Sequence, residues 1–211
     1  MKQRIRNQMT QWCEVGAVLA TGVLHVVFKS LGAQGIFIVL ASVCWISYIV
    51  WQVRQDSSRW MKWGFQTKNL SSAFFWPTLI FIVATAAMAW YGVINGRVLW
   101  EGHMLLLLVL YPLWGILQQF LVQALGVANL FRLFPQYGWW VAVSAGVILF
   151  TLVHYLDWVL MAATGLLACV FIPLYIRDRN LWPLGLYHGW LGTFFYLWVL
   201  GQDPWVTVFG K

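Results

Sequence analysis

Apolar residues fill this chain in runs of about twenty, separated by short polar or charged breaks. A helix needs about 20 apolar residues to cross the hydrocarbon core of a bilayer. The longest runs, such as Met104–Leu117, lack the alternation of apolar and polar residues that is typical of outer-membrane barrel strands. The pattern therefore predicts an all-α, polytopic transmembrane helix bundle of about seven spans. The predicted spans cover residues 9–28, 34–53, 73–95, 102–125, 140–156, 158–176 and 182–200.

The composition agrees with a chain surrounded by lipid. Hydrophobic residues make up 62% of the 211 residues and charged residues only 9%, whereas a soluble domain carries roughly a quarter charged residues. Mean hydropathy is +0.74. No polar stretch is long enough for a separate soluble domain. We therefore expect residues 1–211 to form a single integral membrane domain, with the lipid bilayer as a partner.

The placement of Lys and Arg predicts the orientation. With seven spans and a cytoplasmic N-terminus, only Lys29, Arg97 and Lys211 of the 13 basic residues fall outside, as the positive-inside rule requires. This predicts a protein of the bacterial inner (cytoplasmic) membrane, with its N-terminus cytoplasmic and its C-terminus outside. Six or eight spans fit the same charges. The cations lie at helix ends and not on one face, so the net charge of +7 does not indicate a nucleic-acid partner.

Two histidines, His154 and His188, lie deep inside apolar stretches. An ionisable side chain within a membrane is costly and usually faces the bundle interior, which makes both histidines functional-site candidates. Phe150 and His154 lie four residues apart and share one helical face. Gly185 and Gly189 form a GxxxG motif on the same stripe as His188, and such a motif lets another helix approach closely.

Three glutamines lie close together in the fourth apolar stretch, within LQQFLVQ. In a helix, Gln119 and Gln123 share a face, whereas Gln118 points about 100° away. The first three stretches contain no comparable pattern.

At this point the sequence resembles a known family. Residues 150–192 look like the C-terminal half of the CAAX-protease and bacteriocin-processing (CPBP) intramembrane proteases. That family carries EExxxR on one helix, FxxxH on a second, and on a third a polar turn followed by HxxxN. Here FTLVH at 150–154 matches the second motif, and LYIRDRNLWPLGLYH at 174–188 resembles the third. The likeness covers residues 111–200, which implies a CPBP-like core at 101–211 and motif-free helices at 1–100.

The departures from the family pattern concern its chemistry. Gln118, Gln119 and Gln123 align with the two glutamates and the arginine, and Gly192 aligns with the closing asparagine. In the family, the first glutamate and the two histidines hold or activate the attacking water. Peptide hydrolysis needs a base or a metal ion to activate that water, and a glutamine side chain has no titratable carboxylate. The resemblance therefore implies catalytic positions at His154, His188 and Gln118 that are inactive and hold no metal.

Several roles for this polar cluster remain open from the sequence. The side chains can hydrogen-bond one another and hold three helices in register. They can line a cavity that recognises a polar headgroup, a peptide or a prenyl-like tail, with binding contributions from Gln119, Gln123, Phe150 and Gly192. Retained proteolysis by a rearranged site is a third alternative, and ligation of haem or a metal such as zinc is a fourth. A pigment among the many aromatic residues is not excluded either.

We therefore expect a non-catalytic, CPBP-like membrane protein without a required cofactor. It would act as a scaffold, a chaperone or a subunit of an assembly with other membrane proteins. The alternative is an active endopeptidase of the CPBP type that cuts membrane-associated or prenylated substrates.

Other residues receive simpler interpretations. Glu14 is a candidate for a relocated base, and Asp157 is expected to cap a helix or lie in a turn. His25 and His103 are expected near the outer surface. The segment Gln55–Ser72 mixes cations with aromatic residues, which suits either a helix on the membrane surface or a connecting loop. The remaining expectation is that the unpaired thiols are buried, and it concerns Cys13, Cys44 and Cys169.

Overall fold

A computed structural model describes residues 2–97, 100, 102–155 and 157–209. Every regular element in this part of the chain is a helix. The first four are α1 (Lys2–Ser30), α2 (Gln34–Gln55), the short α3 (Ser58–Lys62) and α4 (Leu70–Ile94). One long, nearly continuous helix follows, made of α5 (Met104–Gln119), the π-helix η1 (Phe120–Val127) and α6 (Ala128–Leu133). After η2 (Pro135–Tyr137) come α7 (Gly138–Leu152), α8 (Trp158–Asp178), α9 (Trp182–Phe194), η3 (Phe195–Leu200) and α10 (Pro204–Phe209).

Five of these helical segments are long and apolar enough to cross a membrane. They are Ile5–Ser30, Gln34–Gln55, Leu70–Ile94, Met104–Leu133 and Trp158–Asp178. Their outward faces carry large apolar side chains such as Val39, Val83 and Leu166, each more than half exposed. A surface of this kind is suited to lipid and not to water. The predicted all-α membrane bundle is confirmed at this level.

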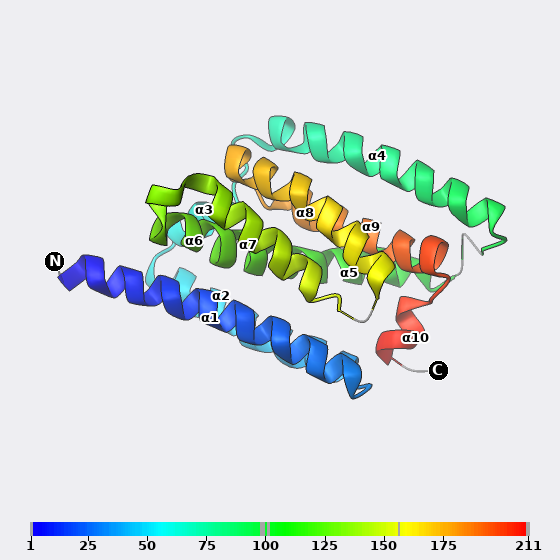
Figure 1. Ribbon diagram of the computed structural model, residues 1–211, viewed down its shortest axis with the longest axis horizontal. Helices are drawn as coiled ribbons and strands as arrows, with labels where there is room; N and C mark the ends of the chain where they lie inside the picture. Colours follow the sequence, from blue (N-terminus) through cyan, green and yellow to red (C-terminus); the bar gives the residue numbers. More distant parts are fainter. Residues whose placement is uncertain (1, 98–99, 101, 156, 210–211) are drawn as a thin grey trace.

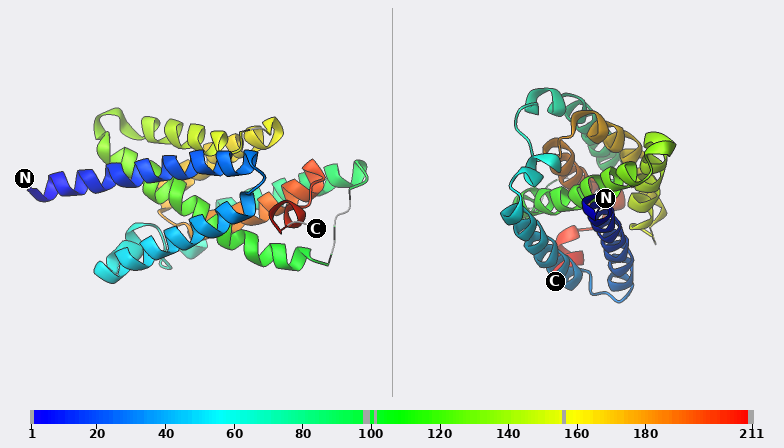
Figure 2. Two further views of the ribbon diagram at one scale, coloured as in Figure 1. Left: turned by 90° about the horizontal axis from the view of Figure 1, so that it is seen from below. Right: turned by 90° about the vertical axis from the view of Figure 1, so that its left-hand side faces the viewer.

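The helices run roughly side by side along the long axis of the molecule. Figure 1 shows α1 and α2 along one side, α4 along the opposite side, and α5 and α9 between them. The end-on view in Figure 2 shows the same grouping around the central helices. The N-terminus and α10 lie at opposite ends of the bundle (Figure 1).

Local sequence signals set several helix ends. Asp157 caps α8, because its carboxylate accepts a hydrogen bond from the Leu160 amide at 2.9 Å, as the sequence predicts. The Asp56 carboxylate accepts bonds from the amide and the hydroxyl of Ser58 at the start of α3. The Ser58 hydroxyl and Lys62 hold the pKa of the Asp56 carboxyl below its usual value. Helix α8 ends at Asp178, and the following Arg179 caps it with a left-handed backbone, with φ of 49°.

The connection between α2 and α4 packs into the bundle. Trp63 and Phe65 are only 6% and 4% exposed, and both rings pack against Phe120 of η1. The Tyr175 hydroxyl donates a hydrogen bond to the Trp63 carbonyl at 3.0 Å. The segment is therefore a connection with one short helix, and its Trp63 and Phe65 side chains supply part of the core.

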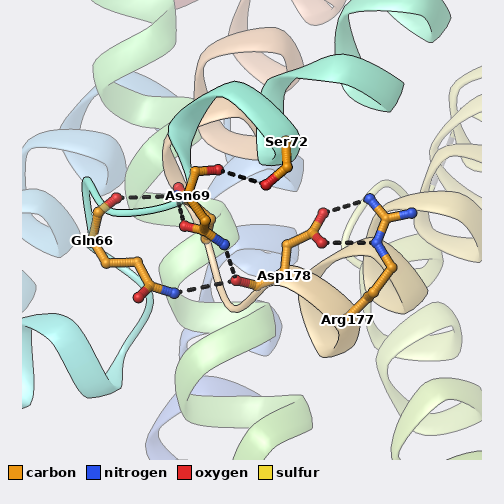
Figure 3. A network of polar contacts seen from close by, with 6 residues as sticks. Gln66, Asn69, Ser72, Arg177 and Asp178 are labelled. Carbon is orange, nitrogen blue, oxygen red and sulfur yellow. Dashed lines mark hydrogen bonds and ion pairs between the residues drawn. The ribbon is translucent and has the colours of Figure 1, made fainter.

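The same connection is tied to the turn between α8 and α9. Gln66 and Asn69 donate side-chain hydrogen bonds to the carbonyl of Asp178, at 3.2 and 2.7 Å (Figure 3). The Asn180 amide donates in return to the Gln66 carbonyl at 3.0 Å. The Leu181 amide also donates to the Gly64 carbonyl at 2.9 Å. These bonds fix the start of α9, which carries His188.

The three cysteines are free, as expected, but they are exposed and not buried. The expectation that these thiols are buried is therefore wrong. An apolar run predicts a buried cysteine only when the run faces protein. In a bilayer the same run can face lipid instead.

Candidate functional site

One cavity of about 130 Å³ lies in the interior of the bundle, among α1, α2, α5, α8 and α9. It brings together Gln118, His154, His188 and Gly192, four of the seven residues that the sequence singles out. Apolar side chains form much of its wall. Its polar lining consists of His25, Gln34, Tyr111, Gln118, His154, Thr164, His188 and Tyr196.

A hydrogen bond between α5 and α9 lies at the centre of the cavity wall. The His188 Nε2 and the Gln118 Oε1 are 3.1 Å apart, so the imidazole donates to the carboxamide oxygen. His188 is 7% exposed. The hydrogen-bond acceptor next to this imidazole is therefore a neutral carboxamide and not a carboxylate.

The two helices can approach this closely because glycines face each other across the contact. A Cβ atom on Gly185 would lie 2.5 Å from the Ile116 Cα, and one on Gly189 would lie 2.5 Å from the Pro112 Cα. On α5, a Cβ atom on Gly115 would lie 2.5 Å from the Gly185 carbonyl oxygen. The GxxxG motif therefore packs against protein, as predicted, and holds His188 next to Gln118.

Phe150 of α7 packs against both histidines. Its ring centroid lies 5.0 Å from that of His188 and 5.8 Å from that of His154. The contact with His154 is edge to face, at an interplanar angle of 88°. Phe150 is 2% exposed, so this buried ring supports both imidazoles from the side of α7.

Each histidine offers one nitrogen that no described residue satisfies. The Nε2 of His154 and the Nδ1 of His188 are buried and form no hydrogen bond with the part of the chain that the structure describes. Buried polar atoms in proteins almost always have a partner. These two atoms can therefore serve as the donors or acceptors for a bound polar group.

Gln119 and Gln123 belong to a different part of the bundle. The Gln123 amide donates to the Gln119 Oε1 at 3.0 Å, and both side chains are only 1% exposed. Their shared face is confirmed. Neither residue lines the cavity, so their hydrogen bond stabilises the junction between α5 and the π-helix η1 and leaves Gln118 as the only glutamine of the three at the site.

Gly192 lies at the cavity wall with room beside it. A Cβ atom there would meet only the Tyr111 Cδ1, at 3.9 Å, which is an ordinary contact. The space that an asparagine side chain would need is thus present, but glycine contributes no side-chain hydrogen-bond donor.

The sequence interpretation missed one histidine of this site. His25 of α1 lines the same cavity as His154 and His188, and its ring packs against Phe37 at 5.2 Å. Like His154 and His188, His25 lies within an apolar stretch, and this position could have identified it as a site candidate. His103 instead pairs with Asp203 at 2.7 Å near the C-terminal end of the bundle.

Carboxylates are absent from the described lining of the cavity. Glu14 lies elsewhere, where its oxygens accept hydrogen bonds from the Tyr48 hydroxyl and the Asn129 amide, so it does not replace the missing base. Within the described residues, no three His, Cys, Asp or Glu side chains are grouped so that they could hold a metal ion. The donor set of the cavity is therefore imidazole, amide, phenol and hydroxyl.

A second, apolar cavity of about 280 Å³ adjoins this site. It lies between α4 and α8 in front of α9, and it shares Thr164, His188 and Gly192 with the histidine cavity. Its other walls are apolar and include Ala84 and Met88 of α4. An apolar chain in this cavity would therefore reach the imidazole of His188.

Comparisons of the chain with protein-family models, with curated proteins and with solved structures find no match. The arrangement of its own residues is therefore the basis on which its function is inferred.

Proposed function

We propose that this chain is a non-catalytic, CPBP-like membrane protein that acts by binding, as a scaffold, a chaperone or a subunit of a membrane assembly. The hydrogen bond between the Gln118 carboxamide and His188 is the observation that carries this proposal. It occupies the position in which the related hydrolases would have their proton acceptor.

The side chains at this site favour ligand binding over peptide hydrolysis. A peptide bond is hydrolysed when a base or a metal ion activates water and donors stabilise the resulting oxyanion. A carboxamide cannot take a proton from water, and Gly192 offers no side-chain donor. Loss of one oxyanion donor alone costs about 10²–10³-fold in rate. With the base absent as well, little turnover is expected.

The two adjoining cavities indicate the class of ligand. The unpartnered nitrogens of His154 and His188 suit one polar group, and the apolar cavity between α4 and α8 suits an attached hydrocarbon chain. A lipid or a prenyl-like molecule has both parts. Such a ligand would enter the site from the bilayer, because α4 and α8 are two of the five helical segments that are long and apolar enough to cross a membrane.

The same proposal includes the finer topology. In this proposal α7 and the α9–η3 pair count as two further spans beside the five long segments, which gives seven. The basic residues of α3, α6 and the α8–α9 turn then share the cytoplasmic end with the N-terminus. This gives a cytoplasmic N-terminus and an external C-terminus in a bacterial inner membrane.

The proposal is tested first by looking for proteolysis. Purified wild-type protein in liposomes is incubated with a prenylated peptide and with the same peptide lacking the prenyl group. We expect no cleavage of either one. Cleavage by the wild type that disappears in both His154→Ala and His188→Ala would overturn the proposal.

Binding is tested in the same preparation. We expect a lipid or prenyl-like molecule to co-purify with the protein and to be detected by mass spectrometry of an organic extract. Gly192→Leu would fill the junction of the two cavities and reduce its recovery severalfold. Gly16→Leu is the matched control, because a Cβ atom at Gly16 meets nothing within 4 Å. If both variants retained equal amounts of the co-purified ligand, the ligand would not bind at this site.

Active proteolysis remains a second candidate, because His154, His188 and Gln118 line one cavity. Metal analysis and the Gln118→Glu variant distinguish the two. One stoichiometric zinc in the wild type would favour the protease. Cleavage gained by Gln118→Glu alone would show that the carboxylate is the only missing part.

A further inference from the structure

Two more cavities meet at the N-terminal end of the bundle, away from the histidine cavity. The first, of about 480 Å³, is largely polar and is bounded by α1, α3 and α6. The second, of about 620 Å³, is a mainly apolar groove between α1 and α2. Thr10 and Glu14 line both of them, so the two cavities adjoin at these residues and give a composite space with a polar end and an apolar end.

The polar end has an excess of positive charge. Arg59, Lys62 and Arg132 line it, against the two carboxylates of Glu14 and Asp56. Lys62 pairs with Asp56 at 3.2 Å. The two arginines therefore face a single remaining carboxylate, which leaves one positive charge uncompensated.

The remaining carboxylate is already bound by other side chains. The oxygens of Glu14 accept hydrogen bonds from the Tyr48 hydroxyl and the Asn129 amide. The Oδ1 of Asn129 in turn accepts a bond from Arg132 at 3.0 Å, which holds this guanidinium at the cavity wall. Arg59 donates no side-chain hydrogen bond within the described part of the chain. Both arginines can therefore bind an anion without first breaking a salt bridge to Glu14.

The apolar end has the length of one membrane leaflet. Along α1 the groove extends from Arg6 to Ala17, a distance of about 16 Å at 1.5 Å per residue. This is close to half of the roughly 30 Å hydrocarbon core of a bilayer. Exposed apolar side chains border it on both helices, including Met9 at 63% and Trp51 at 56%.

We propose that this composite space is a specific site for one phospholipid with a net negative charge. Its phosphodiester group would lie against Arg59 and Arg132, and one acyl chain would lie in the groove between α1 and α2. A single negative charge neutralises the excess charge of the polar end. A zwitterionic lipid would add an ammonium group, which the two arginines repel. This site is separate from the ligand site proposed around His188.

Competition between two lipids tests the proposal. The purified full-length protein in detergent is mixed with equimolar phosphatidylglycerol and phosphatidylcholine of the same acyl chains, and the adducts are measured by native mass spectrometry. We expect the phosphatidylglycerol adduct to predominate. Arg59→Gln should weaken it about tenfold, the effect expected from loss of a charge-assisted hydrogen bond. Arg54→Gln is the control, because this exposed cation at the end of α2 lines neither cavity.

Equal weakening by Arg54→Gln and Arg59→Gln would show diffuse attraction to the basic end and would overturn the specific site. Equal adducts of the two lipids would do the same. Glycerol 3-phosphate is added as a competitor, and displacement by it at the concentration at which lipid binds would identify a site for small anions. Ala17→Trp fills the apolar groove at an exposed position, so it should weaken lipid binding without lowering the melting temperature. If lipid binding were unchanged in this variant, the acyl chain would not occupy the groove, and the proposal would be overturned.

Discussion

Gly189 shows how little space separates α9 from α5 at the histidine cavity. Gly189→Ala would place a methyl group 2.5 Å from the Pro112 Cα. Backbone atoms cannot move aside cheaply, so we expect the variant to lose about 1–3 kcal/mol of stability. Thermal unfolding in detergent measures this loss. Gly192→Ala, one turn further along α9, adds a methyl group 3.9 Å from its nearest neighbour and should unfold as the wild type does. Equal melting temperatures for the two variants would contradict the close contact.

Glu14 provides a second test at the residue scale. Its carboxylate accepts hydrogen bonds from both Tyr48 and Asn129. Glu14→Gln replaces one acceptor by an NH₂ group that faces another donor, which leaves a buried donor unsatisfied. We expect a loss of about 1–3 kcal/mol in the free energy of unfolding, measured by denaturant titration in detergent. Thr10→Val, at a neighbouring position on α1 whose hydroxyl bonds only to the Arg6 carbonyl within the described residues, should change stability by less. A larger loss in Thr10→Val would show that Glu14 does not organise this contact.

The sequence identified the residues of the histidine cavity that follow helical spacing. Phe150 and His154, or Gly185 and Gly189, share a face because they are four residues apart, and this follows from helix geometry alone. His25 was not assigned to this cavity because its partners lie on other helices, and single-sequence spacing contains no information about contacts between distant segments. The neighbours of Gln118 could be expected only through the resemblance to a family of known arrangement.

At the scale of elements, the contact between the α2–α4 connection and the α8–α9 turn makes a clear prediction. The Asn180 side chain donates to the Gln66 carbonyl and to the Asn69 Oδ1, and it accepts from the Trp182 amide at 3.1 Å. Asn180→Ala removes all three bonds, so we expect a loss of about 1–3 kcal/mol and faster proteolysis of the connection. Limited proteolysis followed by mass spectrometry locates the cut.

The matched control for this prediction is Ser72→Ala. The Ser72 hydroxyl forms a hydrogen bond only with the nearby Asn69 carbonyl, at 3.1 Å, within the described residues. We expect its proteolysis to follow the wild type. If Asn180→Ala were cut no faster than Ser72→Ala, the turn would not depend on these bonds.

Helix boundaries and irregular helices were the hardest elements to predict. The apolar run at 102–125 extends in the structure to Leu133 and contains the π-helix η1, because buried side chains on every side leave no polar break to mark its end. The segment Gln55–Ser72 has the composition of a surface helix, but Trp63 and Phe65 turn inward. Composition describes what a segment can bury and does not show which neighbour covers it.

At the scale of the whole molecule, the proposed orientation predicts opposite labelling of two engineered cysteines. The three native cysteines are replaced by alanine, and Ser57→Cys or Gln202→Cys is then introduced; both positions are exposed. With the N-terminus in the cytoplasm, a membrane-impermeant maleimide added to intact cells should label position 202 and not position 57. Permeabilised cells provide the control, because both positions should then be labelled. Labelling of position 57 and not of position 202 in intact cells would show the opposite orientation and would contradict the proposed topology.

The class of the molecule followed directly from the sequence. A chain with 9% charged residues cannot cover its surface with polar groups, so a membrane bundle was required before any contact was known. The five long apolar helices confirm that class. Helices α7 and α9 are shorter than a full crossing, with 15 and 13 residues, because a turn interrupts one and a π-helix continues the other.

The inward turn of Trp63 and Phe65 has a consequence for how the chain can be divided. These two rings pack beside Phe120 and Tyr175. Residues 104–211 made alone would therefore expose apolar core surface there, and the Tyr175 hydroxyl would lose its hydrogen-bond acceptor. When residues 1–96 are produced with it as a separate polypeptide, the two fragments should associate and the fragment 104–211 should fold. The N-terminal half of the chain therefore supplies core side chains that the C-terminal half needs in order to pack completely.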